Sequence, residues 1–287
     1  MLRFPASARR LPMPPDNDNG RPPRGSGGEL RNAMQIPHNP FKRALHDGRQ
    51  QIGFWCAIPS NYVSEILAGA GFDWIVLDTE HSPNELPNVH AQLQSMVGGT
   101  AQPVVRVPWN DSVTLKRFLD IGTQSFLIPM VQTAEEAKAA VAATRYPPHG
   151  IRGYAVAARA TRFGRIPDYF ERYADEMCVL VQVETIEALE RVEEIAAVPG
   201  VDGVFIGPGD LSASMGFLHQ PAHPKVVEVI EKGLGRIAAA GNRGGVLVSD
   251  PALAQRYMAA GSVFTAVGVD AALFARTVDG VVKRYKG

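Results

Sequence analysis

From Pro40 to its C-terminal end, the chain repeats one pattern: a short apolar run, a polar turn, an amphipathic stretch and a glycine. Short apolar runs bounded by turn residues are typical of strands buried on both faces, and strands that alternate with helices are typical of a parallel sheet. The pattern occurs eight times in about 250 residues, the usual size of a TIM barrel. It therefore predicts a (β/α)8 TIM barrel. A doubly wound open sheet is the alternative, but none of the runs has the polar alternation of an exposed edge strand.

The expected strands and helices follow from this repeat. The strands are expected at residues 52–58, 74–80, 103–107, 125–130, 178–184, 203–207, 245–248 and 263–267. The helices that follow them are expected at residues 61–70, 86–96, 112–121, 134–144, 186–197, 224–240, 252–260 and 270–285, with only a small turn near 211–216. The rhythm breaks at residues 146–165, which have no periodic pattern and precede a short helix at 167–175. A loop of this length in a compact domain is usually functional.

The first 36 residues differ in composition from the rest because they are rich in proline, glycine, arginine and asparagine. Such a segment buries too little apolar surface to fold, so we expect a disordered extension over residues 1–36 and one barrel domain over residues 37–287. The extension has no apolar stretch of the roughly 7–15 residues that a secretory signal needs.

The charge balance and the cysteines restrict the possible partners and location. The chain has 29 Lys and Arg residues against 29 Asp and Glu residues, which gives no reason to expect binding to nucleic acid or to an acidic membrane. No apolar run reaches the about 18 residues needed to cross a bilayer. Cys56 and Cys178 lie far apart in apolar runs, a pattern that favours buried free thiols over a disulfide. We therefore expect a cytoplasmic protein without a nucleic-acid or membrane partner.

Polar residues gather where the expected strands end. In a TIM barrel these ends meet around one mouth, where the active site lies. The residues expected there are Trp55, Asp78, Glu80, His81, Arg106, Gln132, Gln182, Glu184, the segment 207–210 and, as an apolar wall, Leu247. Among them we expect Trp55, Gln182 and Leu247 to contact the substrate.

Glu184 and Asp210 close two apolar runs that are consecutive along the chain. Two carboxylates on neighbouring strands repel each other, and a hard divalent cation such as Mg²⁺ relieves that repulsion. The alternatives are that Asp210 is a helix N-cap and that Glu184 pairs with an arginine. The segment before Asp210 contains Gly207 and Gly209, so the backbone amides of Gly209 and Asp210 are free to face a carboxylate.

His81 follows Asp78 by three residues. A carboxylate that accepts a hydrogen bond from one imidazole nitrogen leaves the other as a base, although a solvated turn explains the spacing equally well. Arg106 ends an apolar strand, where it faces either a substrate oxyanion or a salt-bridge partner inside the barrel. No lysine lies at a strand end, which disfavours a Schiff base. This set suits a 2-oxo acid whose enolate is stabilised by a metal and Arg106.

These segments, in this order, resemble the HpcH/HpaI aldolase family, and within it the branch of 4-hydroxy-2-oxoheptanedioate aldolases. The resemblance runs from about Phe41 to the C-terminal end. The segments that carry it are Asp-Thr-Glu-His-Ser-Pro-Asn at 78–84, Val-Arg at 105–106, Tyr-Pro-Pro-His-Gly-Ile-Arg-Gly at 146–153, Val-Gln-Val-Glu-Thr at 181–185 and Phe-Ile-Gly-Pro-Gly-Asp-Leu-Ser at 205–212.

The resemblance implies a class II pyruvate aldolase. It implies that His81, oriented by Asp78, is the base, that Arg106 holds the enolate, and that Glu184 and Asp210 bind Mg²⁺, Mn²⁺ or Co²⁺. Such enzymes cleave 4-hydroxy-2-oxo acids reversibly to pyruvate and an aldehyde, and some use hydroxypyruvate as donor. The resemblance further implies a homohexamer, a dimer of trimers in which the last helix, residues 271–285, packs on a neighbour.

Two other functions stay open. A CoA-ester lyase of the citryl-CoA or malyl-CoA type would need a basic surface for the CoA phosphates, and no such cluster stands near the expected mouth. A barrel that binds keto acids without catalysis is the other alternative, and the intact set of acidic, histidine and arginine residues argues against it.

Overall fold

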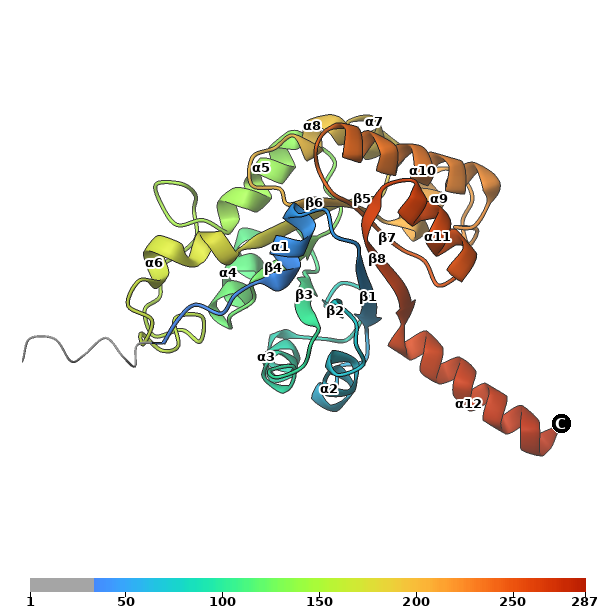
Figure 1. Ribbon diagram of the computed structural model, residues 1–287, viewed down its shortest axis with the longest axis horizontal. Coiled ribbons are helices and arrows are strands. Elements are labelled where there is room, and N and C mark those ends of the chain that lie inside the picture. The colour runs from blue at the N-terminus through green and yellow to red at the C-terminus, as the bar shows by residue number, and fades with distance from the viewer. Residues whose placement is uncertain (1–33) are drawn as a thin grey trace, which may run out of the picture. The chain divides into compact units, whose positions relative to one another are not determined.

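The computed structural model describes residues 34–287, which form a closed barrel of eight parallel strands in chain order (Figure 1). The predicted TIM barrel is confirmed, and the doubly wound alternative is wrong. Of the predicted extension, residues 1–33 lie outside the described residues. The strands are β1 (Gln51–Cys56), β2 (Trp74–Asp78), β3 (Gln102–Arg106), β4 (Ser125–Ile128), β5 (Cys178–Val183), β6 (Gly203–Ile206), β7 (Gly244–Leu247) and β8 (Ser262–Val269).

Helices cover the barrel at the expected places, with differences at three of them. The predicted short helix at 167–175 is a four-residue α-helix followed by a 3₁₀ helix. The predicted helix at 186–197 is two short helices that break at Arg191, and the predicted turn near 211–216 is a helix that begins at Pro208. The helices are α1 (Pro40–His46), α2 (Asn61–Ala68), α3 (Leu86–Ser95), α4 (Ser112–Asp120), α5 (Ala134–Ala143), α6 (Tyr169–Arg172), the 3₁₀ helix η1 (Tyr173–Glu176), α7 (Ile186–Glu190), α8 (Val192–Ala196), α9 (Pro208–Ser214), α10 (Pro224–Ala239), α11 (Pro251–Ala259) and α12 (Asp270–Lys286).

The barrel interior is filled by large side chains, and two glycines make room for them. A Cβ at Gly53 would lie 2.2 Å from the Trp74 ring, and a Cβ at Gly245 would lie 2.2 Å from the ring of Phe264. Phe41 and Leu45 of α1 belong to the same buried cluster, so α1 closes the barrel at the end opposite the mouth. A second buried cluster fills the layer between the strands and the outer helices. Both predicted free thiols, Cys56 and Cys178, are buried and unpaired.

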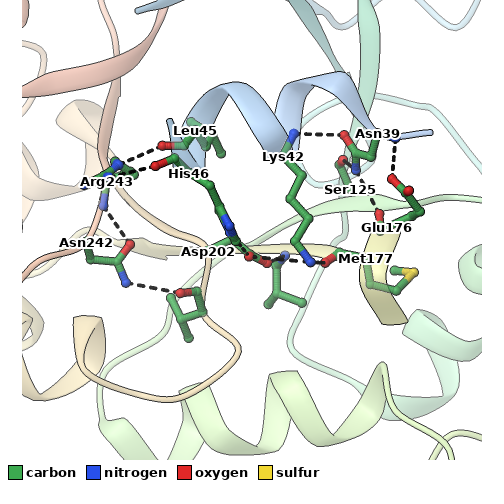
Figure 2. A network of polar contacts seen from close by, with 12 residues as sticks. Asn39, Lys42, Leu45, His46, Ser125, Glu176, Met177, Asp202, Asn242 and Arg243 are labelled. Atoms are coloured by element: carbon green, nitrogen blue, oxygen red, sulfur yellow. Dashed lines mark hydrogen bonds and ion pairs between the residues drawn. The ribbon is translucent and has the colours of Figure 1, made fainter. Parts of the chain in front are cut away.

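A polar network anchors α1 to this closed end (Figure 2). The Asn39 side chain donates to Ser125 Oγ at 2.8 Å and to the Glu176 carbonyl at 3.0 Å, while the Asn39 amide donates to Glu176 Oε2 at 2.6 Å. Lys42 Nζ donates to the Met177 carbonyl at 2.7 Å, and Arg243 reaches α1 from the far side. These contacts hold α1 against the beginnings of β4, β5 and β7.

The predicted loop at 146–165 is irregular, and Arg152 anchors its first part. Arg152 is buried, and its guanidinium lies over the rings of Tyr146, at 4.5 Å, and Tyr173, at 5.4 Å. Its Nη2 also reaches Asp120 Oδ1 at 3.4 Å. Its Nη1 donates to Tyr169 Oη at 3.4 Å, so the arginine ties the loop to α4, α6 and η1.

The last helix, α12, extends away from the barrel (Figure 1). Every residue of this helix after Asp270 is exposed. Its exposed apolar side chains are Leu273, Phe274, Val278, Val281, Val282 and Tyr285. Over residues 34–287, no helix combines the length and apolarity that a membrane span requires.

Candidate active site

A cavity of about 300 Å³ lies at the carboxyl ends of the strands. Except for Glu80 and Gln132, the residues expected at the mouth line this cavity, although they come from six different segments of the chain. The lining residues are Trp55, Ala57, Asp78, His81, Arg106, Gln182, Glu184, Phe205, Gly207, Pro208, Gly209, Asp210, Leu247 and Val269. The structure thus brings the predicted residues together, and their distances limit what each of them does.

Glu184 follows β5 and is 2% exposed. Its Oε1 accepts the Met130 amide at 2.8 Å, and its Oε2 accepts Gln182 Nε2 at 2.6 Å. Gly207 makes room for this carboxylate, because a Cβ there would lie 2.7 Å from Glu184 Oε2. Burial raises the pKa of Glu184 to about 7 despite the two hydrogen bonds, and the charges of neighbouring Glu80 and Asp210 raise it further.

Asp210 lies in the first turn of α9, close enough for its charge to act on Glu184. The N-cap of α9 is Gly207, so the alternative that Asp210 caps the helix is wrong. Asp210 is exposed and Glu184 is buried, but both side chains line the cavity. They follow strands β5 and β6, which pair directly. The two predicted metal ligands therefore stand at adjacent strand ends, as expected.

The residues around Glu184 fit a divalent cation. An acid that stays buried beside two further carboxylates lacks a counter-charge, and Gln182 Oε1 is buried without a hydrogen-bond partner. In residues 34–287, no group of three or more His, Cys, Asp or Glu side chains has the arrangement of a metal site. Two protein carboxylates are nevertheless enough for Mg²⁺, which takes its other oxygens from water and substrate.

Arg106 stands beside Asp78 because the two residues are register partners on β3 and β2. Arg106 Nε donates to Asp78 Oδ1 at 2.8 Å, and Nη2 donates to Oδ2 at 2.7 Å, a two-pronged contact that fixes the guanidinium plane. The guanidinium also lies 4.8 Å from the ring centre of Trp55, whose Nε1 donates to Asp78 Oδ2 at 3.2 Å. Burial acts to raise the pKa of Asp78, but the contacts with Arg106 hold that pKa below its usual value.

The structure corrects one predicted contact in the site. In place of a hydrogen bond between Asp78 and the His81 ring, the Asp78 carboxylate binds Arg106, Trp55 and the backbone amides of Glu80 and His81. The His81 side chain is 64% exposed, and its Nε2 lies 3.9 Å from Glu80 Oε1. The physical reason is that β2 ends at Asp78, so the chain turns before His81 and carries its ring away from that carboxylate.

Glu80 is the residue that sequence reasoning left without a chemical step. Its Oε2 is buried, forms an ion pair with Arg106 Nη1 at 2.8 Å and has no other partner. Burial raises the pKa of Glu80 to about 7, although the charge of Arg106 opposes this rise. The only sequence signal for Glu80 was its place among the polar residues that follow β2. Its burial depends on contacts with β3, which the segment itself does not reveal.

Met130 contributes to the site through its backbone, which no sequence signal indicated. It adopts a left-handed conformation with φ 53°, uncommon for a residue with a side chain, and its amide donates to Glu184. Sequence reasoning also missed the lining residues Ala57, Phe205 and Val269, which carry no functional group.

Comparison with known proteins gives a consistent result. The model of the family described as HpcH/HpaI aldolase/citrate lyase matches residues 51–277. A protein of Rhizobium etli named "Pyruvate aldolase" is 54% identical over 252 residues, covering 88% of this chain and 99% of its own length. A protein of Escherichia coli named "4-hydroxy-2-oxo-heptane-1,7-dioate aldolase" is 52% identical, covering 86% of this chain and 95% of its own length.

A solved structure agrees with these relatives. A crystal structure of an HpcH/HpaI aldolase/citrate lyase family protein from Burkholderia cenocepacia J2315 superposes with a TM-score of 0.83 at 36% identity. It covers 87% of this chain and all of its own chain. The predicted family and the predicted enzyme class, a carbon–carbon lyase, are confirmed. The chain belongs to the HpcH/HpaI aldolase/citrate lyase family.

Proposed function

We propose that this protein is a class II aldolase that cleaves 4-hydroxy-2-oxo acids reversibly to an aldehyde and pyruvate, or hydroxypyruvate. The observation that carries the proposal is that one cavity holds two adjacent carboxylates, Glu184 and Asp210, together with Arg106 and His81. The names of the relatives in Rhizobium etli and Escherichia coli support this substrate class.

Glu184 and Asp210 would hold the divalent cation, which we propose to be Mg²⁺, Mn²⁺ or Co²⁺. When bound, such a cation supplies Lewis-acid stabilisation of negative charge on the 2-oxo acid. Gln182 keeps Glu184 in place through the 2.6 Å hydrogen bond to Oε2. The cost of burying Glu184 as an anion, seen in its pKa of about 7, falls once a positive charge is beside it.

The substrate would lie across the cavity with its carboxylate on the backbone amides of Gly209 and Asp210. Pro208 and Gly209 leave this backbone open, since a Cβ built at Gly209 meets no atom within 4 Å. Trp55 of β1 and Leu247 of β7 line the same cavity and would help to confine the substrate. Arg106 would donate to the 2-oxo oxygen with the N–H groups that Asp78 does not use.

His81 would act as the base. In the cleavage direction it takes the proton of the 4-hydroxyl group, the C4–O bond becomes a carbonyl, and the C3–C4 bond breaks. The electron pair of that bond moves into the enolate of pyruvate, whose oxygen Arg106 stabilises. The aldehyde leaves, and a proton added at C3 completes pyruvate. In the opposite direction the same groups add the enolate to the aldehyde.

We further propose that the protein is a cytoplasmic homohexamer, a dimer of trimers, without a nucleic-acid or membrane partner. The exposed apolar face of α12 supports an assembly, because an isolated chain would leave Phe274 and Val278 in water. The mass of the particle in solution, measured by light scattering, tests this state.

The direct test of the function is pyruvate release from 4-hydroxy-2-oxo acids by the protein with added Mg²⁺, Mn²⁺ or Co²⁺ and after EDTA. We expect release only with the cation, and a rate unaffected by EDTA would contradict the metal mechanism. Parallel reactions with pyruvate or hydroxypyruvate and a panel of aldehydes would define the donor. Cleavage of a CoA ester in place of these acids would indicate the lyase alternative.

A further inference from the structure

We propose that the closed end of the barrel carries a second binding site, which takes the phosphate group of a small organic phosphate. The site lies at the beginnings of β3, β4 and β5, at the opposite end of these strands from the mouth. None of its residues lines the catalytic cavity, so the inference does not depend on the proposed aldolase reaction.

Two adjoining cavities form this site. Their volumes are about 40 Å³ and about 250 Å³, and the residues common to both walls are Pro37, Gly122, Gln124, Arg159 and Arg162. The smaller cavity has roughly three times the room that one buried water needs, which suits a compact anion such as a phosphate group. The larger cavity leaves space for the rest of a small molecule.

Arg159 and Arg162 bring two positive charges to the shared wall, and both residues are half-buried. No aspartate or glutamate lines either cavity. Within residues 34–287, neither guanidinium pairs with a carboxylate. Burial and the charge of Arg162 hold the pKa of Arg159 below its usual value, and no acid opposes them. Two half-buried like charges are unfavourable until an anion binds between them.

The backbone holds both arginines at this wall. Arg159 Nη1 donates to the Ile121 carbonyl at 2.5 Å, and this contact orients the guanidinium and leaves its other N–H groups for a ligand. Arg162 has a left-handed backbone with φ 52°, and Phe163 follows at φ 59°. Such conformations are unfavourable for residues with side chains, and strain of this kind is concentrated at ligand sites. The loop therefore keeps Arg162 in place at a cost in backbone energy.

Thr123 is an independent indication of a ligand in the smaller cavity. It lines that cavity and is 3% exposed, and within residues 34–287 its buried Oγ1 has no hydrogen-bond partner. A buried hydroxyl without a partner costs free energy, and an anion in the cavity would accept its hydrogen. A phosphate monoester has three acceptor oxygens and roughly two negative charges, which match this hydroxyl and the two guanidiniums. A carboxylate has one charge and two oxygens, so it matches them less well.

The larger cavity indicates the body of the ligand. The side chains that it adds are mainly apolar and lie between the end of α3 and the beginning of β3: Leu93, Met96, Val97, Ala101 and Pro103. Burying an apolar group on them is favourable, whereas a second charged group would lose its hydration without a partner. We therefore expect a phosphate ester with a small apolar body, for which phenyl phosphate is a probe.

Isothermal titration calorimetry of the metal-free, full-length protein at constant ionic strength tests the site. The metal is removed because a cation at the mouth would itself bind phosphate. We expect phenyl phosphate to bind most tightly, inorganic phosphate less tightly and benzoate least. Undetectable binding of phenyl phosphate would overturn the proposal. Benzoate that binds as tightly as phenyl phosphate would contradict the phosphate assignment, and inorganic phosphate that does so would contradict the apolar body.

Variants then locate the bound phosphate, with circular dichroism as the control for folding. Arg162→Gln should raise the Kd of phenyl phosphate at least about tenfold, since a hydrogen bond to a charged group contributes a factor of this order. Thr123→Val, which keeps the shape of the side chain, should raise it about threefold to tenfold. The matched control is Arg165→Gln, in the same loop but exposed, which should keep the wild-type Kd. A wild-type Kd in Arg162→Gln, or equal increases in Arg162→Gln and Arg165→Gln, would overturn the proposal.

Discussion

Buried glutamates at the two ends of the barrel have pKa values shifted in opposite directions. At the closed end, Glu176 is 6% exposed. Its carboxylate accepts one hydrogen bond from the Asn39 amide and one from Arg43 Nη2, at 2.8 Å. Although burial raises it, these contacts hold the pKa of Glu176 below its usual value. At the mouth, Glu184 is 2% exposed, and burial raises its pKa to about 7.

The difference shows which end is built for stability and which for chemistry. The closed end satisfies its charges within the chain, as Figure 2 shows for Glu176 and Asp202. At the mouth, Gln182 Oε1 is buried without a hydrogen-bond partner, and the only partner of Glu80 Oε2 is the Arg106 guanidinium. A buried group without a partner costs free energy, and a ligand bound in the cavity would supply a partner for Gln182 Oε1.

Glu184→Gln should have the largest effect on activity. The variant keeps the shape of the side chain but removes a proposed metal ligand, and losing several kcal/mol of charge stabilisation corresponds to a kcat lower by about 10³-fold. Steady-state pyruvate release with saturating Mg²⁺ measures it. The matched control is Glu176→Gln at the closed end, which should keep wild-type kcat. Equal losses in both variants would mean that the two ends do not differ as described.

Arg106→Lys should follow, with kcat lower by about 10²–10³-fold. Lysine keeps the charge but cannot make the two-pronged contact with Asp78, so the donor that faces the 2-oxo oxygen is no longer fixed. The same assay measures kcat and KM separately, with circular dichroism as the control for folding. Retention of wild-type kcat would show that a positive charge alone is sufficient at this position.

Asn39→Ala should lower stability and leave kcat unchanged. The substitution removes three side-chain hydrogen bonds at the closed end, two donated by Asn39 Nδ2 and one accepted by Oδ1 from the Lys42 amide. Their loss in a buried site costs about 1–3 kcal/mol in the free energy of unfolding. Urea denaturation followed by circular dichroism gives this energy. A loss of catalysis without a loss of stability would contradict the separation of the two ends.

Of these four variants, Glu80→Gln should have the smallest effect, which is a change in how the free energy of unfolding depends on pH. Because the pKa of Glu80 rises from 4.5 to about 7 on folding, the folded state holds the proton over this range and the unfolded state does not. Stability from this group is therefore present below pH 4.5 and is lost as pH rises toward 7.

The variant should lack the part of this decline in the free energy of unfolding that Glu80 causes, on the order of 1 kcal/mol. Urea denaturation of metal-free wild type and variant at pH 5 and pH 7.5 measures the difference. Parallel pH curves for the two proteins would show that Glu80 has the same pKa in both states. For Glu176 the sign is opposite, because its lowered pKa stabilises the fold above pH 4.5.

The sequence predicted the barrel well because each strand core is a run of residues that only a buried strand accommodates. The run 74–77 became the fully buried part of β2, beside β1 and β3 as the repeat requires. Helix α9 was missed because Pro208 and Gly209 are typical of a turn. Pro208 instead occupies the first helical position, where proline fits.

The sequence also located the candidate site, since strand ends at one mouth must meet. It did not predict the pairing inside the site. Asp78 and His81 are close in the chain, yet the β2–β3 register places Asp78 opposite Arg106, and the turn after β2 directs His81 elsewhere. Spacing along one segment cannot show which side chain a neighbouring strand supplies. For the same reason the raised pKa of Glu80, which depends on burial, could not be predicted from the sequence.

The most direct test of the account is deuterium exchange at the methyl group of pyruvate, followed by proton NMR, because it measures enolate formation without any aldehyde. Metal-depleted protein should exchange these protons only slowly, and added Mg²⁺ or Mn²⁺ should restore rapid exchange in the wild type but not in Glu184→Gln. Rapid exchange by the metal-depleted wild type, or by Glu184→Gln, would contradict the claim that the carboxylates at the mouth hold a catalytic cation.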